Sequence, residues 1–167
     1  MNRYLILISF LFASVLQAQK QDEIAINKVL DSWHRAAAEA DFKEYFDKMA
    51  DSSVFIGTDA TENWDKEEFM EFSKPYFDKG KAWDFTPLER HVYIGPNSNI
   101  AWFDELLDTW MQLCRGSGVM IREEGTWKIS HYVLSLAIPN DAIEGVIELK
   151  KENDSILKSS ILLSQPN

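Results

Sequence analysis

Apolar residues in the first part of the chain recur at three- and four-residue spacing. This period predicts an amphipathic helix over residues 21–40. Its apolar stripe consists of Ile26, Val29, Leu30, Trp33, Ala36, Ala37 and Ala40. His34 lies at the edge of this stripe, where a surface or capping role is typical of histidine.

Two capping-box patterns predict the helices that follow. Asp41 precedes Glu44 by three residues, and Asp65 precedes Glu68 in the same way. In a capping box, the side chain of the first residue accepts from the N–H three residues later, and the side chain of that later residue accepts from the N–H of the first. We therefore expect a short helix from residue 42, and a third helix over 66–79 with a kink at Pro75. A short strand over 53–56 and a loop over 57–64 are predicted between them.

After Gly80 the apolar period becomes strand-like and stays so. Four strands are predicted, over 83–94, 100–110, 113–123 and 127–136. Helices followed by consecutive strands indicate an α+β fold, in the order α-α-β-α-β-β-β-β. We expect a curved antiparallel sheet that wraps around the N-terminal helices as a cone with one open mouth. A short helix over 142–150 and a loosely held polar tail complete the prediction.

The N-terminus has the composition of a secretory signal peptide. Arg3 precedes an apolar stretch over 5–16, and Gln17-Ala18-Gln19 offers a small-residue cleavage site. We predict cleavage near Ala18 and a periplasmic or extracellular mature protein. The expected organisation is a leader over 1–18, one domain over 19–140, and a C-terminal helix and tail over 141–167.

Charge and cysteine usage exclude several classes of function. The chain has 17 basic and 27 acidic residues, a net charge of −10, which becomes −11 when Arg3 leaves with the leader. Nucleic acid and anionic membranes are poor partners for such a protein. Cys114 is the only cysteine, so no internal disulfide forms, and a buried apolar role is typical of such a residue. The spacings typical of metal ligands are missing, so we expect neither a metal nor another cofactor.

Strand register decides which side chains share a face of the sheet. A three-residue loop at 123–125, with Gly125 in the left-handed conformation, would place Ser117 opposite His131. A turn at 111–112 would place Asp108 opposite Arg115 and Asp104 opposite Val119. One face would then carry Trp102, Asp104, Leu106, Asp108, Trp110, Arg115, Ser117, Trp127, Ile129 and His131. A register that differs by one residue replaces Asp104 and Asp108 with Glu105 and Thr109.

The predicted face contains candidates for acid–base chemistry, provided that it is concave and enclosed. Asp108 would neutralise Arg115, because a buried charge needs a partner. Asp104 would remain as a general base, His131 as a proton relay, and Arg115 as the stabiliser of developing negative charge. The alternative is a structural salt bridge with a satisfied core histidine.

Five segments resemble a SnoaL-like group of secreted bacterial proteins within the nuclear transport factor 2-like superfamily. They are 55–62 (FIGTDATE), 81–85 (KAWDF), 101–105 (AWFDE), 114–119 (CRGSGV) and 127–132 (WKISHY). The resemblance implies that the pocket lies inside the cone. It implies that Trp33 approaches from the first helix and that Trp64 and Trp83 lie near the mouth. It also implies homodimerisation through the convex face of the sheet, where Tyr132, Leu134 and Leu136 would lie.

Two functional hypotheses follow. The first is cofactor-free acid–base chemistry, of the isomerase, cyclase or hydratase type, on a small apolar or carbonyl-bearing molecule in an aromatic-lined pocket. Trp33, Trp64, Trp83, Trp102, Asp108, Ser117 and Ile129 would line that pocket. The second is a non-catalytic dimeric module that binds a small molecule or a protein. The fold alone does not distinguish between them.

Overall fold

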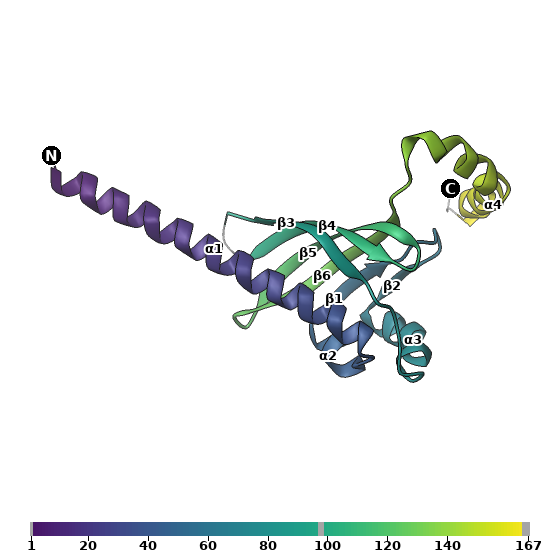
Figure 1. Cartoon of the computed structure of the whole chain (residues 1–167), viewed down its shortest axis with the longest axis horizontal. Coiled ribbons are helices and arrows are strands. Elements are labelled where there is room, and N and C mark those ends of the chain that lie inside the picture. The colour runs from purple at the N-terminus through teal and green to yellow at the C-terminus, as the bar shows by residue number, and fades with distance from the viewer. Residues whose placement is uncertain (1, 97–98, 165–167) are drawn as a thin grey trace. The chain divides into compact units, whose positions relative to one another are not determined.

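A computed structural model describes residues 2–96 and 99–164, with side chains from Gln17 onward (Figure 1). The chain divides into two compact units, Met1–Leu136 and Ala137–Asn167. The apolar part of the predicted leader lies outside the described side chains. In the described part of the chain, no helix combines the length and the apolar character that crossing a bilayer requires.

The first unit contains three helices and six strands. The helices are α1 (Asn2–Ala38), α2 (Phe42–Asp47) and α3 (Lys66–Phe77). The strands are β1 (Met49–Ile56), β2 (Asn63–Asp65), β3 (Thr86–Ile94), β4 (Ile100–Thr109), β5 (Gln112–Glu123) and β6 (Thr126–Leu136). The order confirms the α+β prediction, with the short strand β2 added. The second unit contains η1 (Asn140–Ala142) and α4 (Ile143–Ser164), so its helix is longer than predicted.

The six strands form one curved sheet in the order β2-β1-β6-β5-β4-β3. Strands β1 and β6 pair in parallel, and every other pair is antiparallel, so the sheet is mixed rather than purely antiparallel. Helix α1 packs along the sheet against β3 and β6, while α3 packs against β1 and β2 (Figure 1). The helices thereby close one face of the sheet.

Local sequence signals set the helix boundaries as expected. The Asp65 side chain accepts a hydrogen bond from the Glu68 N–H, and the Glu68 carboxylate accepts one from the Asp65 N–H, which completes the capping box. Asp41 caps α2 by accepting from the Glu44 N–H. Gly80 follows α3 with φ of +80°, a conformation that glycine adopts without a Cβ penalty.

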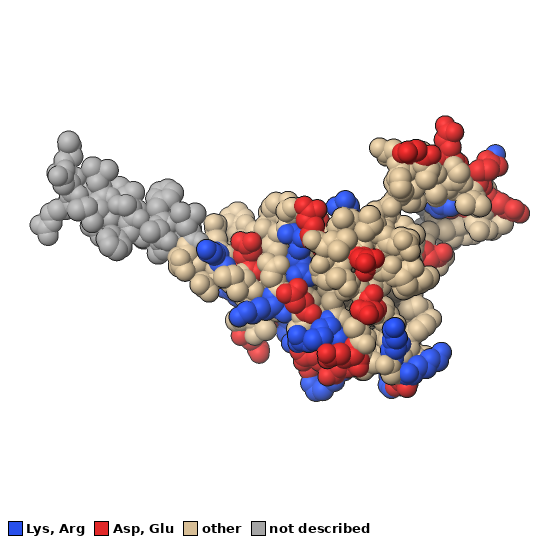
Figure 2. Space-filling view, viewed as in Figure 1, with Lys and Arg blue, Asp and Glu red and all other residues tan. Residues whose placement is uncertain are grey.

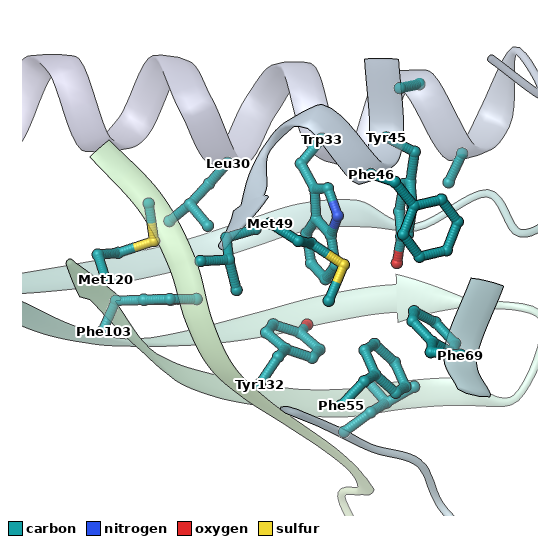
Figure 3. Packing of buried hydrophobic residues seen from close by; sticks show 14 of the residues in the cluster. Leu30, Trp33, Tyr45, Phe46, Met49, Phe55, Phe69, Phe103, Met120 and Tyr132 are labelled. Atoms are coloured by element: carbon teal, nitrogen blue, oxygen red, sulfur yellow. The ribbon is translucent and has the colours of Figure 1, made fainter. Parts of the chain in front are cut away.

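The core lies between the helices and the covered face of the sheet. The predicted stripe of α1 is buried there, including Ile26, Leu30 and Trp33. Figure 3 shows the Trp33 indole reaching from α1 toward Tyr132 of the sheet. The two rings meet edge to face, with centroids 4.8 Å apart. Cys114 is fully buried among these residues, as predicted.

The hairpin turns differ from the prediction and change the register on both sides of β5. Glu124 and Gly125 both have positive φ and form a two-residue turn that pairs Glu123 with Thr126. Such turns match the twist of the strands they join. The β4–β5 turn consists of Trp110 and Met111, one residue earlier than predicted, so Asp104 lies opposite Ser117.

A bulge in β6 has the largest effect on which side chains face the core. Val119 pairs with His131 and Met120 with Ile129, so Ser130 has no partner on β5. The side-chain alternation therefore changes phase at this residue. As a result, Ile129 and Tyr132 both face the core, while His131 faces away from it.

Candidate functional site

The predicted catalytic residues lie together, but on the uncovered face of the sheet. Trp102, Asp104, Ser117 and His131 border one shallow groove there. We call this surface, together with Tyr93, His91 and Arg115, the outer face. The expectation that these residues line an enclosed, concave site is therefore wrong. Their place follows from strand alternation, because the neighbouring residues Ala101, Phe103 and Glu105 are the buried ones.

The expected pair of Asp108 and Arg115 does not form. Asp108 lies opposite Leu113 and is exposed. Arg115 instead approaches Asp104, with 3.9 Å between Nη1 and Oδ1. His91 Nδ1 also lies 3.1 Å from Asp104 Oδ1, so Asp104 has two cationic or hydrogen-bonding neighbours rather than none.

The remaining predicted residues fall into three environments. Trp33 and Ile129 are buried in the core and do not line the pocket described below. Tyr132 and Leu134, expected on a convex dimer surface, are also in the core, which corrects that prediction. Leu136 is exposed, at the end of β6. Trp64 and Trp83 do line the pocket, as the resemblance implied.

A pocket of about 210 Å³ lies on the covered side of the sheet, and we call it the aromatic pocket. It is lined by Phe55, Gly57, Thr58, Glu62, Trp64, Phe69, Phe72, Tyr76, Ala82, Trp83, Phe85, Trp110 and Leu134. Three of its rings are nearly parallel: Phe55 stacks on Phe69 at 4.0 Å, and Phe69 lies 5.6 Å from Trp64. At the mouth, Trp110 is 79% exposed, which is unusual for so large an apolar side chain.

Helix α3 and the segment after it supply six of the thirteen lining residues. Residues Phe69, Phe72 and Tyr76 recur at helical spacing on α3, so they point to the same side. Trp64 stacks on Phe72 at 4.4 Å and comes from β2, the strand that the sequence pattern missed. The resemblance, rather than strand alternation, implied Trp64 and Trp83 in advance. Most of the other lining residues lie on a helix or in loops, where alternation gives no signal.

A buried ion cluster lies deeper, between α1 and the sheet. It consists of the buried residues Glu105, His34 and Tyr132 and of Arg90, with the exposed Asp31 at its edge. Glu105 Oε1 is 2.8 Å from His34 Nε2 and accepts a hydrogen bond of 2.9 Å from the Tyr132 hydroxyl. Glu105 Oε2 accepts from Arg90 Nε at 2.8 Å, and Arg90 Nη1 donates to Asp31 at 2.7 Å. The surface or capping role expected for His34 is therefore wrong.

The cluster holds Glu105 as a carboxylate. Burial acts to raise the pKa of Glu105, but the hydrogen bonds and charges of His34 and Arg90 outweigh it and leave that pKa below its ordinary value. Burial and the neighbouring carboxylate raise the pKa of Tyr132 well above its ordinary value, so its hydroxyl stays protonated and donates. Both carboxylate oxygens are occupied, which indicates a structural tie between α1, β3 and β4.

No three His, Cys, Asp or Glu side chains within residues 2–96 and 99–164 are grouped as metal ligands would be. Neither the aromatic pocket nor the buried ion cluster offers a ligand set for a metal.

Comparison with known families identifies the fold. The profile of the SnoaL-like domain matches residues 26–139, which covers the C-terminal part of α1, helices α2 and α3, and the whole sheet. The chain belongs to the SnoaL-like domain family. The buried ion cluster, the aromatic pocket and the outer face described above all lie mostly within this SnoaL-like domain.

Solved structures share this fold at low sequence identity. A candidate dehydratase of the nuclear transport factor 2-like family from Streptomyces avermitilis superposes with a TM-score of 0.63 and 13% identity, over 72% of this chain and 99% of that one. A candidate aromatic ring hydroxylase from Novosphingobium aromaticivorans gives 0.61 and 15%, over 71% and 91%. A protein of unknown function from Pseudomonas putida gives 0.58 and 16%, over 70% and 87%. A search of curated proteins finds no match.

Proposed function

We propose that this SnoaL-like domain binds a small, planar, largely apolar molecule in the aromatic pocket. The observation that carries this proposal is the set of aromatic side chains that stay exposed at the pocket mouth. Phe72, Tyr76 and Trp110 are 38%, 44% and 79% exposed. Ligand sites are mostly apolar with a few polar groups, and here Thr58 and Glu62 are the polar members of the lining.

Binding without acid–base catalysis fits this geometry better than the catalytic hypothesis. Asp104, Arg115 and His131 belong to the outer face, on the other side of the sheet from the aromatic pocket. A proton carrier must lie within hydrogen-bond reach of the reacting atom or one water away from it. These three residues therefore cannot act on a molecule held in the pocket. Glu105 is sealed in the buried ion cluster and is fully hydrogen-bonded.

Calorimetric titration with 2-naphthol, a neutral planar probe, tests the binding proposal. We expect saturable binding at one site, weakened roughly tenfold by Trp110→Ala, because burial of an aromatic side chain against a ligand contributes one to two kcal/mol. Trp102→Ala is the matched control, since it removes an exposed tryptophan from the outer face. Absence of saturable binding, or equal weakening by both substitutions, would contradict the proposal.

We also propose that the mature protein begins near Gln19 and is exported. The described side chains of α1 from Gln17 to Gln21 are exposed, and burial begins at Asp22. Removing a leader over 1–18 would therefore cost none of the described core. Intact-mass measurement of the protein purified from the cell envelope fraction tests this. A full-length mass in that fraction would contradict it.

Finally, we propose that two copies associate through the outer face. Tyr93 and Trp102 stack there, with centroids 6.0 Å apart, and are each about half exposed (45% and 49%). Asp104 and Arg115 supply both charge signs on the same surface, so it can pair with its own copy. This proposal keeps the predicted homodimer but moves it away from Tyr132 and Leu134.

A further inference from the structure

The aromatic pocket carries one ionisable carboxylate and no basic group among its lining residues. Glu62 is that carboxylate, and every other side chain of the described lining is neutral at pH 7. The chain as a whole carries a net charge of −10. A negative charge placed within an apolar lining is costly unless a partner compensates it. The pocket therefore has an unmatched negative charge.

The 57–62 loop positions the Glu62 carboxylate. Its Oε2 accepts a hydrogen bond of 3.0 Å from the Asp59 N–H. The Gly57 N–H donates to the Glu62 carbonyl at 3.0 Å, which closes the loop. A Cβ at position 57 would overlap Oε2, so the carboxylate lies directly against the bare backbone of Gly57. No described residue donates a hydrogen bond to the second oxygen, Oε1, which leaves it free for a ligand.

The rings beside Glu62 are suited to a cation. Faces of Trp, Tyr and Phe carry negative electrostatic potential and attract ammonium groups, most strongly when water is excluded. Trp64, Trp83 and Trp110 all contribute to the lining. One ring of the lining already has a cation above it from outside the pocket, because Lys79 Nζ lies 5.7 Å from the centroid of Tyr76.

We infer that the ligand of the aromatic pocket is an organic cation, an ammonium group with apolar substituents. The inference rests on the proposed binding function and specifies the chemistry of its ligand. The ammonium group pairs with Glu62 and lies against the ring faces, while the apolar substituents fill the space between Phe69 and Trp110. The net negative charge of the protein also attracts such a ligand from a distance.

Two probes of equal shape, one charged and one neutral, show how much the positive charge of a ligand contributes to its affinity. Choline carries a trimethylammonium group, and 3,3-dimethylbutan-1-ol replaces it with a neutral tert-butyl group. We expect the mature protein to bind choline roughly tenfold more tightly in calorimetric titration, in the range that desolvated cation–ring contacts provide. Glu62→Gln should remove most of that preference, while the variant should still bind 2-naphthol at one site. The amide oxygen of glutamine can still accept from Asp59, so the loop is retained.

Glu71→Gln is the matched control, because Glu71 is an exposed glutamate of α3 outside the pocket lining. It makes the same change in net charge and should leave the choline preference intact. Equal or tighter binding of the neutral alcohol, or a preference that survives Glu62→Gln, would overturn the cation inference alone. Failure of choline, the alcohol and 2-naphthol together would overturn the binding function as well.

Discussion

At the scale of single residues, Glu105 shows how a charged side chain becomes part of a core. Its side chain is fully buried, yet three donors from α1, β3 and β6 surround it: His34, Arg90 and Tyr132. A buried carboxylate is tolerated when its oxygens are fully paired. The cluster thus connects α1 to the sheet at one position, and its loss should lower the free energy of unfolding.

Glu105→Gln should lower the free energy of unfolding by about 3 kcal/mol at neutral pH, because it removes the buried carboxylate that pairs with the Arg90 guanidinium. The pKa of Glu105 in the folded protein lies below the ordinary value of 4.5. Its stabilisation is therefore complete above that value and is lost as the pH falls through the lower folded pKa. Denaturant titrations at several pH values should show the difference between wild type and variant shrinking in acid.

Exposed Glu89 provides the control for this prediction. Glu89→Gln should change stability by about 0.5 kcal/mol or less. A difference between wild type and Glu105→Gln that stays constant down to strongly acidic pH would contradict the assigned role of the carboxylate.

At the scale of elements, the glycines of β5 make room for the neighbouring strands. Gly116 and Gly118 alternate with Cys114 and Met120 on the buried side of this strand. A Cβ at position 116 would overlap the Tyr132 hydroxyl, and one at 118 would come within 3.0 Å of the Phe103 ring. Glycine within a strand often marks such a close approach.

Gly116→Ala should therefore destabilise the protein by about 2 kcal/mol, the usual cost of overpacking a filled core. The penalty should be smaller in a Tyr132→Phe background, which removes the hydroxyl that the new methyl group meets. Gly145→Ala in α4 makes the same substitution where nothing lies within 4 Å, and should not destabilise. Thermal unfolding of the single and double variants measures this. Equal penalties in both backgrounds would contradict the assigned contact.

The sequence predicted the elements well and their faces poorly. Helix stripes, N-caps and strand periods depend on local spacing, and the structure confirms them, with one of the two predicted capping boxes complete. The faces depended on two turns, each of which differs from the prediction by a single residue, and on a bulge in β6 that was not predicted. Strand β4 did contain a usable signal. Its odd positions are Ala101, Phe103, Glu105 and Leu107 and include one charged residue. Its even positions include two, Asp104 and Asp108, so the odd positions are the better candidates for the buried face.

At the scale of the whole molecule, the two faces of the sheet carry different features. The covered face holds the buried ion cluster and the aromatic pocket, while the outer face presents Tyr93 and Trp102 to solvent. In the view of Figure 2, acidic and basic side chains are interspersed and form no single basic patch.

Light scattering on the eluting mature protein should give the mass of a dimer. Trp102→Glu should give a folded monomer, because a carboxylate on the outer face would be desolvated in the proposed interface. Trp110→Glu places the same charge at the pocket mouth and should remain dimeric. A monomeric wild type, or a dimeric Trp102→Glu variant, would contradict the proposed surface.

The unpaired Ser130 of β6 also has an evolutionary consequence. Loss of this one residue would leave Ile129 and Tyr132 facing inward and His131 facing outward, now in unbroken alternation. The same loss at Val133 would instead turn Leu134 out of the core. Loss of a residue therefore leaves the interior unchanged at one position of this strand and disrupts it at the neighbouring positions. Deletions in descendants of this chain should accumulate at residue 130, and an alignment of them should place its gap there.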